Sequence, residues 1–79
     1  MQSSRLSPNV TLARIGAEVR RCRQSLKCSQ AALATKAGVH PNVIGRIERG
    51  AYNPSIRTLE AIAGALNTSI VELMRRALK

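Results

Sequence analysis

The chain has 79 residues, of which 13 are Lys or Arg and four are Asp or Glu, so its formal net charge is +9 at pH 7. This charge indicates a polyanionic partner, either nucleic acid or an anionic membrane surface, and argues against a neutral or acidic binding module. Hydrophobic residues make up 44% of the chain, too many for a disordered basic tail, and the length leaves room for one core. Tyr52 is the only aromatic residue, which favours duplex over single-stranded nucleic acid, because single strands are held by stacking on several rings.

Several functional classes are not expected from the sequence. The longest small or apolar run, residues 61–66, is far shorter than the roughly 20 residues of a membrane span, and the N-terminus lacks the apolar segment of a secretory leader. Cys22, Cys28 and His40 are too few for a four-ligand zinc site, so we expect no metal and no cofactor. Both cysteines fit small apolar positions, which predicts reduced, core-packed thiols and a cytoplasmic location.

The apolar residues recur at helical spacing from about residue 8 onward, with no alternating run long enough for a strand. The chain is therefore predicted to be all-α, a compact bundle of five helices. Residues 1–7 are polar and aperiodic and are expected to form a flexible tail, which leaves residues 8–79 as a single domain.

The first two predicted helices follow in close succession. The first begins at Ser7 or Thr11 and ends near Lys27. The second uses Ser29 as its N-cap and stops at Gly38, whose missing side chain suits the left-handed position after a helix. The core-facing positions are predicted to be Ile15, Val19, Cys22 and Leu26 in the first helix, and Leu33 and Ala37 in the second.

The third and fourth predicted helices are marked by proline, serine and stop signals. Pro41 occupies the first position of the third helix, which stops at Gly50. Only about three residues separate it from the second helix, and so short a connection forces a tight corner. The fourth helix starts near Ser55 and stops at Asn67. The core-facing positions are predicted to be Ile44 and Ile47 in the third helix, and Ile56, Leu59, Ile62, Ala63 and Leu66 in the fourth.

The outer face of the third helix carries residue types suited to base recognition. At 100° per residue, Asn42, Arg46 and Arg49 lie within roughly 60° of one another on the side opposite the apolar residues, with Gly45 beside them. Asn can pair bidentately with adenine, and Arg with guanine, in the major groove of DNA. The alternative is a merely solvated basic face, since exposed Arg is ordinary on helices.

Four short segments fall at a characteristic spacing: residues 30–34 (QAALA), 37–39 (AGV), 44–50 (IGRIERG) and 53–55 (NPS). They resemble the helix-turn-helix of the XRE, or phage repressor/Cro-like, family, and the resemblance extends over about residues 12–73. It implies a lambda-repressor-like bundle in which helix two crosses the DNA backbone and helix three enters the major groove of double-stranded DNA.

The resemblance also implies roles for single residues. Three positions match base-reading positions: Asn42, Val43 and Arg46. Gln30, Arg49 and Asn53 match positions at which the family contacts the DNA backbone. The other residues expected to contact the backbone are Ser29, Lys36 and Arg57. For Lys36 and Arg57, the alternative is a solvated positive surface without DNA contact. Arg23 and Glu48 match a salt bridge of the family, and each lies roughly 70° from the core centre of its helix, where a charge is half buried only when paired.

The chain departs from the family pattern at three positions. Lys27 stands where the family usually has glycine, so the end of the first helix takes another turn or strains a lysine. Pro41 replaces a hydrogen-bonding side chain, so one base contact is expected to be absent or replaced by apolar contact with a thymine methyl. Gly45 weakens the helix by roughly 0.5–1 kcal/mol but permits close approach to the groove wall. His40, at the start of the same helix, is either a cap or a phosphate neighbour.

The fifth predicted helix has more apolar surface than one core needs. It begins with a capping box in which Ser69 and Glu72 each satisfy one free amide. Its apolar residues cover roughly 160°, whereas one core-facing stripe needs about 100°. We expect Val71, Met74 and Leu78 to form a homodimer interface, which would place two recognition helices roughly 34 Å apart on a palindromic site. The alternative is a frayed or fully core-packed C-terminus.

The sequence therefore predicts a sequence-specific DNA-binding transcriptional regulator without enzymatic activity, most simply a repressor or controller that binds a palindromic operator as a dimer. Its length resembles the controller proteins of restriction-modification systems and short phage or mobile-element repressors, which implies a bacterial or phage-encoded protein of the cytoplasm, associated with the nucleoid. The alternative is an antitoxin-like DNA-binding module whose main partner is a small toxin protein. No membrane association and no small-molecule ligand are expected.

Overall fold

The computed structural model describes residues 7–79, which form five α-helices and no strand. The helices are α1 (Pro8–Ser25), α2 (Gln30–Ala37), α3 (Pro41–Glu48), α4 (Ile56–Ala65) and α5 (Ile70–Leu78). The predicted all-α, five-helix class is confirmed. The tail expected over residues 1–7 lies outside the described residues, apart from Ser7. That serine is the N-cap of α1, because its hydroxyl accepts a hydrogen bond from the amide of Val10 at 3.2 Å.

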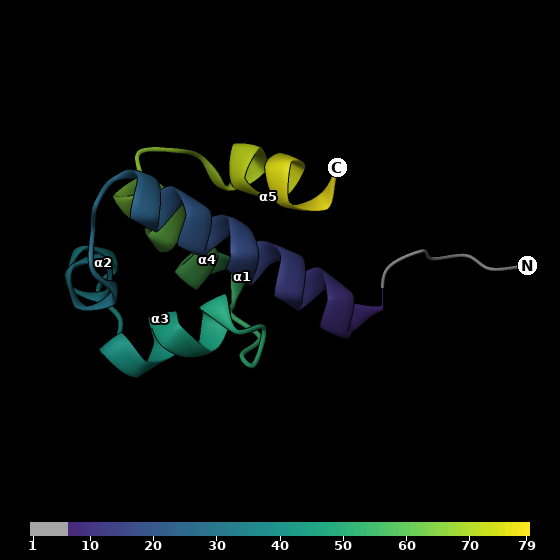
Figure 1. Cartoon of the computed structure of the whole chain (residues 1–79), viewed down its shortest axis with the longest axis horizontal. Helices are drawn as coiled ribbons and strands as arrows, with labels where there is room; N and C mark the ends of the chain where they lie inside the picture. Colours follow the sequence, from purple (N-terminus) through teal and green to yellow (C-terminus); the bar gives the residue numbers. More distant parts are fainter. Residues whose placement is uncertain (1–6) are drawn as a thin grey trace, which may run out of the picture.

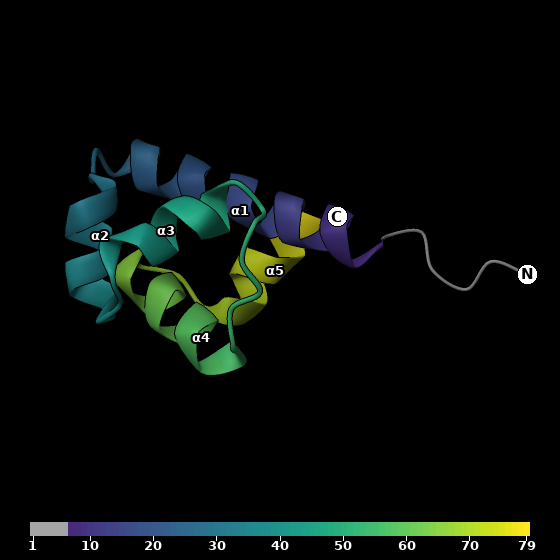
Figure 2. The same ribbon diagram turned by 90° about the horizontal axis from the view of Figure 1, so that it is seen from below.

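The longest helix, α1, lies between α3 and α5 in the view of Figure 1. It packs against α3 on one side and against α5 on another, while α2 contacts both α3 and α4. Figure 1 shows α3 and α5 on opposite sides of α1, and the view in Figure 2 places α2 across one end of the bundle. The face of α3 that points away from α1 is thus separated from α5 by the whole thickness of the bundle.

One core contains residues from all five helices. The buried hydrophobic residues are Ile15, Val19, Cys22, Leu33, Ala34, Ile44, Ile47, Leu59, Ile62, Ala63, Leu66 and Leu73. At the contact between α1 and α3, Gly16 lies so close to the neighbouring backbone that an added Cβ would collide with the carbonyl oxygen of Ile47. This glycine allows α3 to sit directly on α1, which fixes the orientation of its outer face.

Most helices begin at a serine whose hydroxyl accepts the amide hydrogen of the residue three positions later. These N-caps are Ser7, Ser29, Ser55 and Ser69. The exception is α3, where Nδ1 of His40 accepts from the amide of Asn42 at 3.1 Å. A side-chain N-cap stabilises a helix by about 1 kcal/mol. The structure thus supports the capping alternative for His40.

Three expected core positions are wrong or only partly right. Leu26 follows the last residue of α1 and is 46% exposed, because the chain leaves the helix before this side chain reaches the core. Ile56 is the first residue of α4 and is 63% exposed, since the helix turns onto the core only further along. Ala37, in the last turn of α2, is half-buried.

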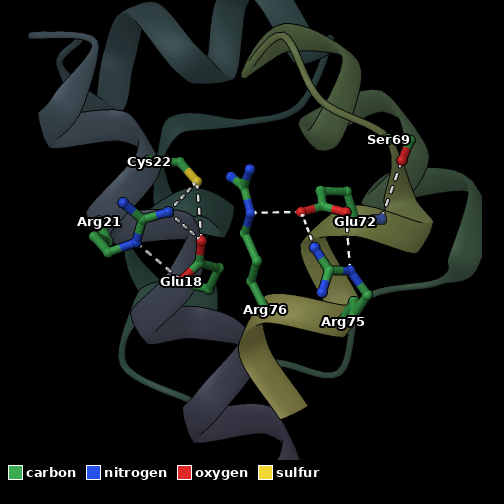
Figure 3. Close-up of polar contacts among 7 residues, drawn as sticks. All are labelled: Glu18, Arg21, Cys22, Ser69, Glu72, Arg75 and Arg76. Carbon is green, nitrogen blue, oxygen red and sulfur yellow. Dashed lines mark hydrogen bonds and ion pairs between the residues drawn. The ribbon is translucent and has the colours of Figure 1, made fainter. Parts of the chain in front are cut away.

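The expected capping box of α5 forms only in one direction. Ser69 accepts from the amide of Glu72 at 3.0 Å, as expected. The carboxylate of Glu72, however, accepts hydrogen bonds from Arg75 and Arg76 instead of the Ser69 amide (Figure 3). These arginines lie one turn further along the helix, and their three charge-assisted bonds outcompete one bond to a backbone amide.

Four residues adopt left-handed backbone conformations at the ends of helices. Gly38 and Gly50 have φ values of 73° and 71°, and Asn67 has a φ of 61°, in agreement with the expected stops. Lys27 has a φ of 55°, so the chain strains a lysine at the end of α1 instead of taking another turn. Among the described residues, no helix is long and apolar enough to cross a bilayer.

Candidate nucleic-acid interface

Helices α2 and α3 form a helix-turn-helix with a very short corner. Gly38 ends α2 in the left-handed conformation, and the amide of Val39 donates to the carbonyl of Ala34 at 3.0 Å. His40 then caps α3, and Pro41 is its first residue. Because both helices are anchored to the core by fully buried side chains, Leu33 and Ile44, the corner holds α3 at a fixed angle to α2.

The exposed face of α3 bears a shallow hollow of about 330 Å³. Its lining residues are Gln30, Pro41, Asn42, Gly45, Arg46 and Arg49. An added Cβ at Gly45 would lie 3.3 Å from Nη1 of Arg49 and 3.6 Å from Oε1 of Gln30. The glycine therefore lets the side chains of Gln30, from α2, and Arg49, at the end of α3, come close together over it.

The charge at this hollow is uncompensated. Arg46 and Arg49 are exposed, and neither has a carboxylate within ion-pair distance among residues 7–79. Their planar guanidinium groups present several N–H donors, which suit phosphate oxygens and the acceptor edge of guanine. The hollow can therefore take an anionic, hydrogen-bond-accepting partner.

A buried ion pair supports the interface from beneath. The guanidinium of Arg23, on α1, donates to both carboxylate oxygens of Glu48, on α3, at 2.6 and 3.1 Å. The two side chains are only 12% and 3% exposed. Arg23 also donates to the carbonyl of Cys28 at 2.9 Å, and Gln30 donates through Nε2 to Glu48 at 3.0 Å. The structure thus forms the pair expected from the sequence, and this pair links α1, α2 and α3 at one carboxylate.

The other candidate residues lie around this hollow or beyond it. Val43 is half-buried and packs against the core, so only part of its side chain is available to a base. The candidate backbone-contacting residues outside the hollow are all exposed: Ser29 at the start of α2, Lys36 near its end, Asn53 in the loop after α3, and Arg57 in the first turn of α4. No group of three potential metal ligands occurs within residues 7–79.

Two features of the structure were not predicted from the sequence. The guanidinium carbon of Arg46 lies 5.2 Å from the centre of the Tyr52 ring, a contact for which the only signal was that Tyr52 is the sole aromatic residue. Glu18, on α1, is buried and accepts from Arg21 at 3.0 and 2.6 Å (Figure 3). The i,i+3 spacing of these two residues was a signal for an ion pair.

The cysteines differ in their surroundings. Cys22 is buried and donates its S–H to Glu18 at 3.3 Å. Burial, followed by the hydrogen bond to this carboxylate, raises the pKa of the Cys22 thiol, which makes it a poor nucleophile. Cys28 was expected to pack in the core; it lies between α1 and α2, is half-buried and packs against the core cluster.

The geometry therefore defines a helix-turn-helix protein with a basic outer face on the second helix of the motif. A helix-turn-helix family model matches residues 19–73. The immunity repressor protein of Bacillus phage phi105 is 41% identical over 56 residues, 71% of this chain and 39% of the repressor. The control protein C.SmaI of Serratia marcescens is 41% identical over 58 residues, 73% of this chain and 69% of that protein.

The fold is shared with a solved controller protein. The crystal structure of the restriction-modification controller protein C.AhdI from Aeromonas hydrophila matches with a TM-score of 0.77 at 32% identity, over 78% of this chain and 94% of that one. The chain therefore belongs to the helix-turn-helix family, a class of DNA-binding transcriptional regulators, and the resemblance seen in its motifs is confirmed. It spans 39% of the length of the phage repressor, and most of the length of the controllers.

Proposed function

We propose that this protein regulates transcription by binding a palindromic DNA operator as a homodimer, and that it has no enzymatic activity. The observation that carries the proposal is the unpaired basic hollow on the outer face of α3, presented by a helix-turn-helix corner. In this arrangement α3 enters the major groove, with Asn42, Val43 and Arg46 toward the bases. The relatives named a repressor and controllers support the regulatory role.

The DNA backbone would be held by residues on both sides of this helix. The first amides of α2 and the side chain of Gln30 suit a phosphate, because a helix N-terminus attracts anions. The other residues assigned to phosphate contacts are Ser29, Lys36, Arg49, Asn53 and Arg57. Bound in this way, the protein would act on DNA in the cytoplasm and block a promoter by occupying it.

Dimer formation would use the apolar surface that α5 leaves outside the core. Leu73 is fully buried, whereas Val71 is 72% exposed and Met74 and Leu78 are half-buried. These three residues form a continuous apolar strip, since they are spaced three and four positions apart. A two-fold contact along this strip would cover apolar surface that is otherwise exposed to water.

Selection of bound duplexes from a random pool tests the proposal. We expect a palindromic consensus whose half-sites are about one helical turn apart, and an affinity that falls steeply with salt. Bound sequences without any consensus would contradict sequence-specific regulation.

Sedimentation tests the dimer separately. We expect Val71→Glu to shift the protein toward monomer, since two buried carboxylates would face each other across the two-fold axis. Leu26→Glu is the matched control, because it also replaces an exposed apolar residue, at the far end of α1. A wild-type monomer at tens of micromolar, both free and on DNA, would refute the interface.

A further inference from the structure

The side chain of Arg46 rests on a ring that does not belong to its own helix. Its guanidinium carbon lies 5.2 Å from the ring centre of Tyr52, in the loop between α3 and α4. Tyr52 is half-buried and packs against the core, whereas Arg46 is exposed. The ring is thus fixed by its packing against the protein, and the exposed arginine contacts the ring.

The partner of Arg46 is an aromatic ring, whereas the other arginines for which the structure shows a side-chain partner contact a carboxylate. Arg21, Arg23, Arg75 and Arg76 each pair with a glutamate. A carboxylate would compete with a guanine for the guanidinium N–H donors and would cancel the positive charge. The face of an aromatic ring attracts the cation without using those donors, which point outward along the guanidinium edges.

The expected gain is preorganisation. An arginine side chain has several rotatable bonds, and fixing them upon binding costs entropy. A side chain already held over a ring loses less freedom when it reaches a base edge. Because Arg46 lines the hollow on the outer face of α3, a restriction of its position acts directly on the group assigned to base recognition.

We propose that Tyr52 is a positioning residue that determines sequence specificity, by holding Arg46 in the orientation in which it reads a guanine. This inference rests on the proposed function, because it assigns Arg46 to base recognition. It extends the surface that determines base recognition from α3 to the loop that follows, and assigns a role to the only aromatic residue of the chain.

The contact itself is tested in the free protein by NMR. We expect the Arg46 Nε–H resonance to be shifted by the ring current in the wild type and in Tyr52→Phe, and to return to the ordinary arginine position in Tyr52→Leu. The phenylalanine variant keeps the ring and loses only the hydroxyl. An Arg46 resonance identical in all three proteins would overturn the proposal, whether or not DNA is bound.

The consequence is tested by affinity for the selected duplex and for duplexes changed at single base pairs. For the wild type and Tyr52→Phe we expect equal discrimination at the guanine read by Arg46. Tyr52→Leu should lower that discrimination roughly two- to fivefold, the effect of one exposed cation–π contact, and leave the other positions unchanged. In an Arg46→Ala background, Tyr52→Leu should have no further effect on discrimination.

The outcomes separate this inference from the proposed function. If the wild type selects no consensus, both are wrong. If Arg46→Ala relaxes one base pair but Tyr52→Leu leaves that base pair unaffected, the proposed function stands and the inference fails. Two further results would overturn the inference: a loss of discrimination spread evenly over all base pairs in Tyr52→Leu, or a loss of discrimination that persists in the Arg46→Ala background. Either result would reflect a change of loop structure.

Discussion

The carboxylate of Glu48 has partners from two other helices, Arg23 on α1 and Gln30 on α2. We expect Glu48→Ala to leave the Arg23 guanidinium buried without a counter-charge, which costs about 3 kcal/mol or more and lowers Tm by roughly 12 °C or more in a chain of this size. DNA affinity should also fall, because Gln30 loses the bond that orients it. Thermal unfolding and a binding titration measure the two effects.

The control for this prediction is Glu60→Ala, which removes the same charge from an exposed position on α4 that has no ion pair within residues 7–79. This variant should unfold within about 0.5 kcal/mol of the wild type. Equal melting of the two variants would show that Glu48 has no structural role.

A second carboxylate makes stability depend on pH. The hydrogen bonds from Arg21 hold the pKa of Glu18 below its ordinary value, although burial opposes this shift. The folded state therefore favours the ionised form of Glu18. Its contribution to the free energy of unfolding is fully present above the ordinary carboxyl pKa, and is lost as the pH falls through the lower, folded-state pKa. We expect Tm to fall on acidification below roughly pH 4, and to fall less steeply in Glu18→Gln. A Glu18→Gln curve parallel to the wild type would exclude this linkage.

Among the side-chain contacts, the sequence predicted one ion pair but not the network of hydrogen bonds around it. The Arg23–Glu48 pair was predictable because a family motif and the helical phase of each residue pointed to the same contact. The contacts of Gln30 with Glu48 and of Arg46 with Tyr52 were not, because each joins a helix to a neighbouring element whose placement depends on the packed fold. Periodicity specifies the face of a helix on which a residue lies, but not which loop covers it.

At the scale of elements, the end of α1 contains a local strain that can be removed. Lys27 adopts a φ of 55°, a left-handed conformation that costs a residue with a Cβ about 1 kcal/mol or more. Lys27→Gly should therefore raise stability by roughly 0.5–1 kcal/mol, after the greater chain entropy of unfolded glycine is subtracted. Lys27→Ala keeps the Cβ and loses the charge, so it should give no such gain. Equal unfolding free energies for the glycine and alanine variants would contradict this account.

The helix starts were the most predictable elements because their signals are local. A serine before a helix supplies its cap within three residues, and all four serine caps lie where a start was expected. The ends were less predictable, since Leu26 continues the apolar spacing of α1 although the helix has already stopped at Ser25. A left-handed lysine gives no sequence signal of the kind that glycine gives, so the pattern overestimated the length of α1.

At the scale of the whole molecule, the basic residues placed within residues 7–79 lie on more than one side of the bundle. Arg14, Arg21, Arg76 and Lys79 line a hollow between α1 and α5, which lies across the bundle from the outer face of α3 (Figure 1). In the proposed complex these side chains point away from the DNA. The number of phosphates neutralised should therefore be well below the number of basic residues.

This division of charge predicts a difference between two variants that have the same net charge. For the proposed complex, the logarithm of affinity falls linearly with the logarithm of salt concentration, with a slope of about −0.9 for each phosphate neutralised. Arg57→Ala, on the first turn of α4, should make that slope shallower by about 0.9 for each subunit bound and weaken all sequences alike. Arg14→Ala removes the same charge from the α1–α5 side and should leave the slope nearly unchanged, because counterions are released only where a cation meets a phosphate. Titrations of both variants from low to physiological salt measure the slopes, and equal changes would mean that DNA responds to the net charge of the protein rather than to one face of it.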